Sequence, residues 1–187
     1  MEVGPQPPML PRMARRTLLL TCLVGVLLAS LLPATAQTAV RSRTTLSALD
    51  AGVVAELNGI RAAHGLAPLR INPKLAEAAR RHSSEMLAKG YFAHESPDGS
   101  PFWQRVKQFY GAGPHGFWLV GENIVWSAPD LDAKETVDLW MGSPPHRKII
   151  LTAGWREVGI AAIHTGAANG FSTGPLTIVT ADFGVRR

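Results

Sequence analysis

Apolar residues recur at helical spacing in four segments of the chain, and capping signals mark where these segments begin. The first begins at Ser47, where Asp50 three residues later completes a capping box. The second begins at Asn72-Pro73, a capping residue followed by proline in the first helical position. The pattern predicts four helices, over residues 47–65, 72–90, 100–109 and 132–141.

The pattern changes near the end of the chain. Two runs rich in β-branched residues, Val158 to Ile163 and Leu176 to Val179, are separated by turns rich in Gly, Asn and Ser. We interpret them as two or three antiparallel strands. Strands that follow a series of helices predict an α+β domain built in layers.

The first 36 residues have the features of an export signal. Three arginines precede an apolar run, Leu18 to Leu32, and the small-x-small tripeptide Ala34-Thr35-Ala36 follows it. We expect cleavage after Ala36, which leaves a flexible linker over residues 37–46 and one domain over residues 47–187. An uncleaved membrane anchor is the alternative. Arg15-Arg16 also leaves open whether the general or the twin-arginine export route is used.

The composition of the expected mature chain limits its partners. Cys22 is the only cysteine and lies inside the apolar run, so we expect neither lipidation nor any disulfide or cysteine metal site after cleavage. Residues 37–187 hold 16 basic and 13 acidic residues, with no basic cluster longer than a pair. We therefore expect no nucleic-acid partner. We also expect no transmembrane span after cleavage, and weak association with an anionic cell envelope is compatible with this charge.

Four motifs of the chain resemble those of a known family. They are Leu57-Asn58 with Arg61 and Gly65-Leu66-Ala67-Pro68-Leu69; Tyr91-Phe92-Ala93-His94; Gly121-Glu122-Asn123-Ile124; and Trp140-Met141-Gly142-Ser143-Pro144-Pro145-His146-Arg147. In this order and spacing they resemble the bacterial SCP-like branch of the CAP superfamily. That superfamily comprises cysteine-rich secretory proteins, antigen 5 and plant pathogenesis-related proteins. The resemblance extends from about Leu49 to Gly184.

The resemblance implies a three-layer α-β-α sandwich with a small antiparallel sheet and a large cleft. In animal and plant relatives, two histidines and two glutamates line this cleft. Position by position, His94 and His146 correspond to the histidines and Glu122 to the first glutamate. Ser143 stands in place of the second glutamate, as is common in the bacterial branch. Any role that requires the second carboxylate is therefore not implied here.

Each of these residues also has an interpretation without a ligand. His94 lies in a polar segment and could brace a loop instead of contacting a ligand. Glu122 lies in an apolar stretch, where a carboxylate needs a partner, and it could connect loops as well as line a cleft. His146 follows two prolines at a predicted helix N-terminus, which favours the neutral imidazole. His82 lies on the inner face of its helix, where we expect a structural role.

A metal site is a further hypothesis. As neutral imidazoles, His94 and His146 are candidate ligands for zinc or another divalent ion. No local motif of the HExxH type supports such a site, and the proximity of the two histidines is implied only by the family resemblance. We therefore expect at most weak metal binding and no required cofactor.

The function most compatible with these observations is that of a secreted, extracellular or cell-envelope binding module without catalysis. Its cleft, formed by His94, Glu122, Ser143 and His146, would hold a lipid, a glycan or a peptide. The alternative is a metal-assisted hydrolase, for example a peptidase, that uses the same cleft. The binding module is favoured because the mature chain has no cysteine nucleophile and no Gly-x-Ser-x-Gly motif.

Overall fold

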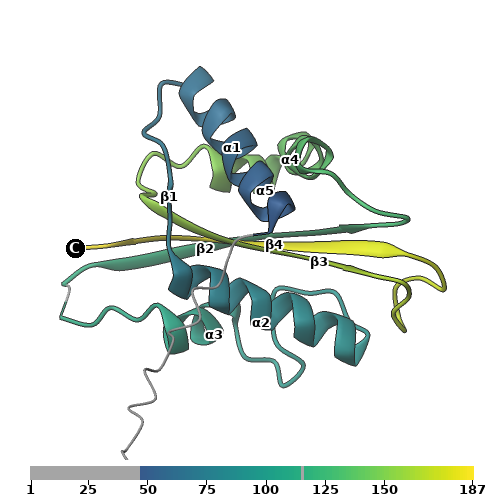
Figure 1. Ribbon diagram of the computed structural model, residues 1–187. Helices are drawn as coiled ribbons and strands as arrows, with labels where there is room; N and C mark the ends of the chain where they lie inside the picture. Colours follow the sequence, from purple (N-terminus) through teal and green to yellow (C-terminus); the bar gives the residue numbers. More distant parts are fainter. Residues whose placement is uncertain (1–46, 115) are drawn as a thin grey trace, which may run out of the picture. The chain divides into compact units, whose positions relative to one another are not determined.

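The computed structural model describes residues 47–114 and 116–187, so the predicted signal peptide (residues 1–36) and linker (residues 37–46) lie outside the described residues. Within the described part, a sheet separates two layers of helices (Figure 1). One face is covered by α1 (Ala48–Ala63), α4 (Ala133–Gly142) and α5 (Pro144–Ile150), and the other by α2 (Pro73–Lys89) and α3 (Phe102–Phe109). The α+β class and the three-layer α-β-α sandwich are confirmed.

The helix ends follow from local sequence signals. Ser47 and Asp50 form the capping box of α1, each side chain accepting a hydrogen bond from the other residue's backbone N–H. α2 begins after Asn72 and ends at Gly90, which adopts the left-handed conformation with φ 68°. The start of α3 differs from the prediction, because Pro101 is its N-cap and no side chain caps it.

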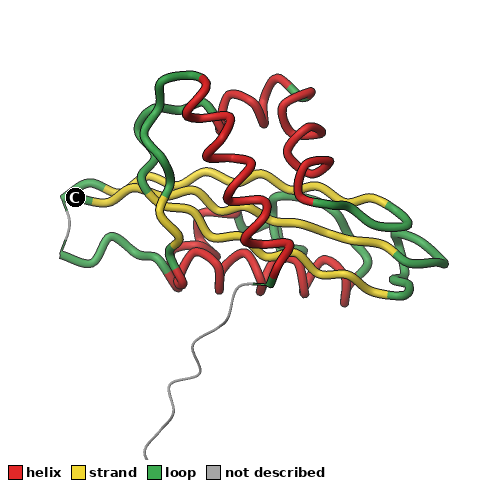
Figure 2. The backbone as a smooth tube through the Cα atoms, turned by 45° about the horizontal axis from the view of Figure 1, so that its top comes forward, coloured by secondary structure: helices red, strands yellow, loops and turns green. Residues whose placement is uncertain are grey.

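The sheet has four strands in the order β1-β3-β4-β2, which Figure 2 shows as a continuous layer. Its long strands β2 (Trp118–Ser127), β3 (Glu157–Thr165) and β4 (Leu176–Arg186) are antiparallel, and the short β1 (Arg70–Ile71) pairs in parallel with β3. β3 and β4 correspond to the two predicted strand regions. The sequence pattern does not predict the strand β2. It predicts a helix N-terminus at His146 but only a short turn there, and not a helix that extends to Ile150.

Successive residues of the central strand β4 face opposite helical layers. Phe183 packs in a core cluster with Leu57 of α1 and Trp140 of α4, whereas Ile178 packs with Met86 of α2. β2 lies at the edge of the sheet, so its outer side is accessible to the loops that follow α2 and to the α4–α5 segment.

Candidate functional site

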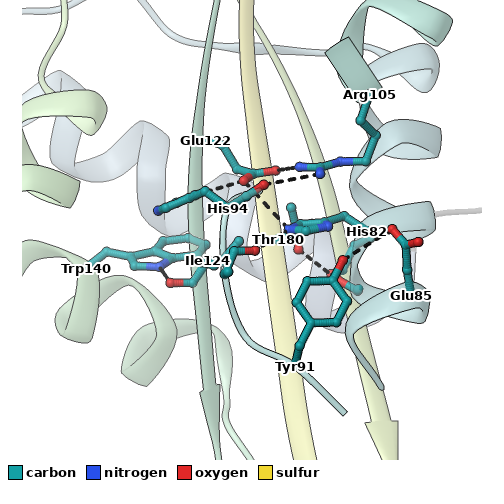
Figure 3. Close-up of polar contacts among 12 residues, drawn as sticks. His82, Glu85, Tyr91, His94, Arg105, Glu122, Ile124, Trp140 and Thr180 are labelled. Carbon is teal, nitrogen blue, oxygen red and sulfur yellow. Dashed lines mark hydrogen bonds and ion pairs between the residues drawn. The ribbon is translucent and has the colours of Figure 1, made fainter. Parts of the chain in front are cut away.

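The candidate site is built around Glu122, a buried residue of β2 whose two carboxylate oxygens both have partners (Figure 3). Nδ1 of His94 lies 2.8 Å from Oε1 of Glu122. The guanidinium of Arg105, from α3, donates to Oε2 of the same carboxylate. Arg105 is itself buried, so a buried charge pair of opposite signs holds the carboxylate in place.

The loop that carries His94 is fixed by two helices. Nε2 of His82, on α2, donates to the backbone carbonyl of Ala93 over 3.0 Å. Nη1 of Arg105 lies 3.3 Å from the backbone carbonyl of His94 and donates to it. His82 therefore lies in the core, as its position in the helix predicts, and it also anchors the loop of the candidate site.

These contacts determine the tautomer of His94. A carboxylate can only accept hydrogen bonds, so Nδ1 of His94 carries the proton that is shared with Glu122. In the neutral ring, Nε2 is then an acceptor with a free lone pair. The side chain of His94 is 39% exposed, whereas that of Glu122 is fully buried. The imidazole is therefore the part of this network that a ligand can reach.

His146 approaches His94 from the other layer of helices. Their ring centroids are 6.4 Å apart, and the ring planes are inclined by 57°. The side chain of Asn123 donates to the backbone carbonyl of His146 over 3.2 Å. Because adjacent residues of a strand point to opposite faces, Glu122 positions His94 on one side of β2 while Asn123 positions His146 on the other.

The pKa of His146 is lowered from its ordinary value, mainly by burial and secondly by the charge of nearby His94. The direction agrees with the one expected from the sequence, and burial of the ring is its main cause. A lowered pKa favours the neutral ring at physiological pH.

Ser143 is placed differently from the three residues above. It lies between α4 and α5, and its backbone N–H donates to the carbonyl of Trp140 over 3.2 Å. Its side chain makes no capping hydrogen bond to α5. It lines a groove of about 750 Å³ together with residues of the β2–α4 loop and of α4, and none of His94, Glu122 and His146 is among the lining residues.

The residues that are brought together offer limited metal coordination. Both oxygens of Glu122 are engaged by His94 and Arg105, so the carboxylate is not free to bind an ion. Across residues 47–114 and 116–187, no three His, Cys, Asp or Glu side chains are grouped so that they could hold a metal ion. The donor set is thus a pair of imidazoles, one fewer than the protein ligands of a catalytic zinc centre.

The comparison with known families identifies the domain. The cysteine-rich secretory protein family, CAP, matches residues 54–183. The chain belongs to the CAP family. The match includes His94, Glu122, Ser143 and His146. The role of these four residues as a ligand-binding cleft remains a prediction.

Two curated relatives come from Bacillus subtilis (strain 168). The chain is 36% identical to the uncharacterised protein YkwD over 143 residues, 74% of this chain and 53% of YkwD. It is 33% identical to the uncharacterised membrane protein YlbC over 103 residues, 55% of this chain and 28% of YlbC. The CAP domain described here therefore spans about half of one relative and about a quarter of the other. In the described part of this chain, no helix has the length and apolar character needed to cross a membrane.

Solved structures share the CAP fold. An extracellular SCP-domain protein from Bacillus anthracis has a TM-score of 0.55 and 27% identity, covering 72% of this chain and 39% of that chain. An outer surface protein from Borrelia burgdorferi has a TM-score of 0.58 and 17% identity, covering 72% of this chain and 90% of that chain. At 17% identity, the second likeness shows the fold alone. The names of both proteins describe them as extracellular or at the outer surface.

Sequence reasoning missed two members of the site in this CAP domain. Arg105 lies on α3 outside the four family motifs, and Asp182 lies on β4 directly opposite Glu122. Asp182 is fully buried, and its pKa is raised well above its ordinary value, first by burial and then by the charge of Glu122. The only sequence signal is an acidic residue inside an apolar run, which indicates a buried group with special surroundings.

Proposed function

We propose that this CAP domain is an extracellular binding module without catalysis, and that the partly exposed imidazoles of His94 and His146 form part of its ligand-binding surface. The observation that carries the proposal is the geometry of Glu122. Its carboxylate is buried and engaged on both oxygens, while the imidazole that it orients is partly exposed. Such a network presents one fixed hydrogen-bond acceptor and excludes water from the charges behind it. This arrangement suits recognition.

The same geometry argues against the hydrolase hypothesis. A general base must reach the proton that it removes, directly or through one water. Glu122 has no exposed side-chain surface, and its charge is balanced by Arg105. Among residues 47–114 and 116–187, no imidazole is hydrogen-bonded to the side chain of Ser143, so this hydroxyl has no activating base there. Activity of this surface would have to come from the imidazoles alone.

The extracellular location is supported by the name of one relative and by the predicted export signal. The Bacillus anthracis protein, which is 27% identical, is described as extracellular. The N-terminal arginines, the apolar run and Ala34-Thr35-Ala36 have the features of a cleaved signal. We therefore place the function outside the cytoplasm, free or at the cell envelope.

Native mass spectrometry of the protein purified from culture medium tests the binding module. We expect a co-purified lipid, glycan or peptide on the wild-type protein and a lower bound fraction on His146→Ala. The exposed His64, the C-cap residue of α1, provides a matched control, because His64→Ala removes an imidazole that belongs to none of the contacts described above and should keep the bound fraction. A protein that carries no ligand and cleaves casein or an ester with added zinc, but not after His146→Ala, would contradict the proposal.

Zinc binding provides a second test of the imidazole pair. Calorimetric titration at pH 7.5 should give weak binding, because two imidazoles are fewer ligands than a dedicated zinc site uses. The affinity should be lower at pH 5.5, since protons compete with zinc for the ring nitrogens. His146→Ala should abolish the binding and His64→Ala should not. Tight binding that survives His146→Ala would show that the ligands are other residues.

A further inference from the structure

Asp182 is a buried carboxyl group that the proposed binding role does not use. It lies in the middle of β4 with no exposed surface, and both of its side-chain oxygens lack a hydrogen-bond partner among the described residues. Its cross-strand neighbour is Glu122 on β2. Directly opposite residues of antiparallel strands have Cβ atoms about 4.5–5.5 Å apart, so the two carboxyl groups face each other at close range.

The charges around this pair do not balance two carboxylates. Arg105 from α3 is the cation of the cluster, and its guanidinium already donates to Glu122 and to the carbonyl of His94. His82 from α2 donates Nε2–H to a carbonyl, and burial lowers its pKa to about 4, so it is neutral at pH 7. An ionised Asp182 would therefore add an uncompensated buried charge, which is strongly unfavourable.

We infer that Asp182 holds a proton at neutral pH and donates it to the carboxylate of Glu122, so that the pair carries a single negative charge. Each oxygen of Glu122 accepts one hydrogen bond, from His94 or from Arg105, and keeps a second lone pair for the O–H of Asp182. The shared proton satisfies two buried carboxyl groups at once. It also leaves one negative charge opposite one guanidinium.

Asp182 is then a positioning residue for His94. It fixes Glu122 from the sheet, as Arg105 fixes it from α3, and Glu122 in turn fixes the Nδ1–H tautomer of His94. The importance of this orientation for ligand binding rests on the proposed function. The protonation state of Asp182 does not depend on that function, and it is tested without a ligand. If the protonated Asp182 is refuted, the proposed binding function still stands, and the reverse is also true.

The inference predicts a specific dependence of folding on pH. In the unfolded chain Asp182 is ionised above about pH 5, while in the folded protein it keeps its proton, so the contribution of this one group to folding stability falls as the pH rises. Asp182→Asn removes this contribution with a neutral side chain of the same shape that can still donate to Glu122. In urea titrations at pH 5, 6 and 7, the ratio of the folding constant of Asp182→Asn to that of wild type should rise about tenfold per pH unit.

Thr180→Val is the matched control. Thr180 lies on the same strand and face, and its hydroxyl is hydrogen-bonded to buried Ser83 over 2.8 Å. This variant should lose stability by the same factor at every pH, because no titrating group changes. A ratio for Asp182→Asn that is likewise constant from pH 5 to pH 7 would overturn the inference.

The side-chain ¹³C shifts of the wild-type protein give a second measurement that does not require the variant to fold. The Cγ shift of Asp182 at pH 7 should be that of a protonated acid, and the Cδ shift of Glu122 that of a carboxylate. A carboxylate shift at Asp182 would overturn the inference, including the case in which Glu122 holds the proton instead.

Discussion

Among single residues, Arg105 contacts the candidate site at two points. Its guanidinium contacts the carboxylate of Glu122 and the backbone carbonyl of His94 at the same time. Arg105 and Glu122 are both buried, so neither charge has water as an alternative partner. Removing one member of such a pair leaves the other charge buried and unpaired. This lowers the free energy of unfolding more than replacing both members by apolar residues would.

We predict that Arg105→Met lowers the free energy of unfolding by about 3–5 kcal/mol, because the charge of Glu122 loses its partner. Chemical denaturation at pH 7 measures this loss. Arg80→Met is the matched control, since Arg80 also pairs with a glutamate, Glu77, but both side chains are exposed, 52% and 37%. There we expect a change of at most about 1 kcal/mol. Equal losses in the two variants would contradict the burial argument.

The limits of the sequence analysis are visible in these same residues. The positions of His94, Glu122 and His146 follow from the family resemblance, and the structure brings the three together. Arg105 has no local signal, and Asp182 has only that of an acidic residue inside an apolar run, because the partner of each is Glu122 on a different element. A buried polar contact between distant segments becomes visible only once the register of the sheet and the packing of α3 are known.

Among the elements, the edge strand β2 explains the order of residues in its motif. Glu122 and Asn123 point to opposite faces, and Trp140 of α4 donates its Nε1–H to the carbonyl of Ile124 over 3.1 Å. A Cβ on Gly121 would lie 2.9 Å from the ring of Trp155, so only glycine fits there without a shift. Each residue of the Gly121-Glu122-Asn123-Ile124 motif therefore has its own structural role at its position.

The strand β2 and the full length of the helix α5 are not predicted from the sequence, for physical reasons. β2 contains Gly121, Glu122 and Asn123 in its middle, and these are weak strand formers, so its stability comes from ten paired positions on β4. The helix α5 begins with two prolines, Pro144 and Pro145, which end the predicted helix before them and indicate a helix N-terminus but not how far the new helix extends. Proline is nevertheless compatible with the first helical turn, where its missing N–H has no partner to lose.

The helix α2 packs directly against the backbone of β3 at Gly159. A Cβ on Gly159 would lie 1.9 Å from the backbone nitrogen of Ala76, an atom that a side-chain rotation cannot move away. We predict that Gly159→Ala displaces α2 from the sheet and lowers the free energy of unfolding by about 3 kcal/mol or more. Thermal unfolding measures this. Gly166→Ala, where the added Cβ meets nothing within 4 Å, is the control, and an equally large loss there would contradict the steric explanation.

For the domain as a whole, the buried side chains of His82 and Asp182 should change the folding stability in opposite directions as the pH changes. Burial lowers the pKa of His82 to about 4, and burial beside Glu122 raises the pKa of Asp182. A histidine whose folded pKa is lowered contributes stability above its unfolded pKa, and this is lost as the pH falls toward the folded value. An aspartic acid whose folded pKa is raised has the opposite effect. The two contributions partly cancel in the wild-type protein, which flattens its stability across mildly acidic pH.

Removing the histidine should reveal this compensation. In His82→Gln the amide can still donate to the carbonyl of Ala93, but no proton is taken up on acidification. The wild-type protein should therefore lose stability relative to His82→Gln by about 1.4 kcal/mol per pH unit, beginning near pH 6.5 and ending near pH 4, because only its unfolded state binds the proton in that interval. Urea titrations of both proteins from pH 7 to pH 4 measure the difference.

Ser83→Ala is the control, because it changes a neighbouring buried residue without a titrating group. Its free energy of unfolding should differ from that of wild type by the same amount at every pH. If the His82→Gln difference is also constant with pH, His82 is not held neutral by burial, and the cluster must accommodate a second positive charge beside Arg105.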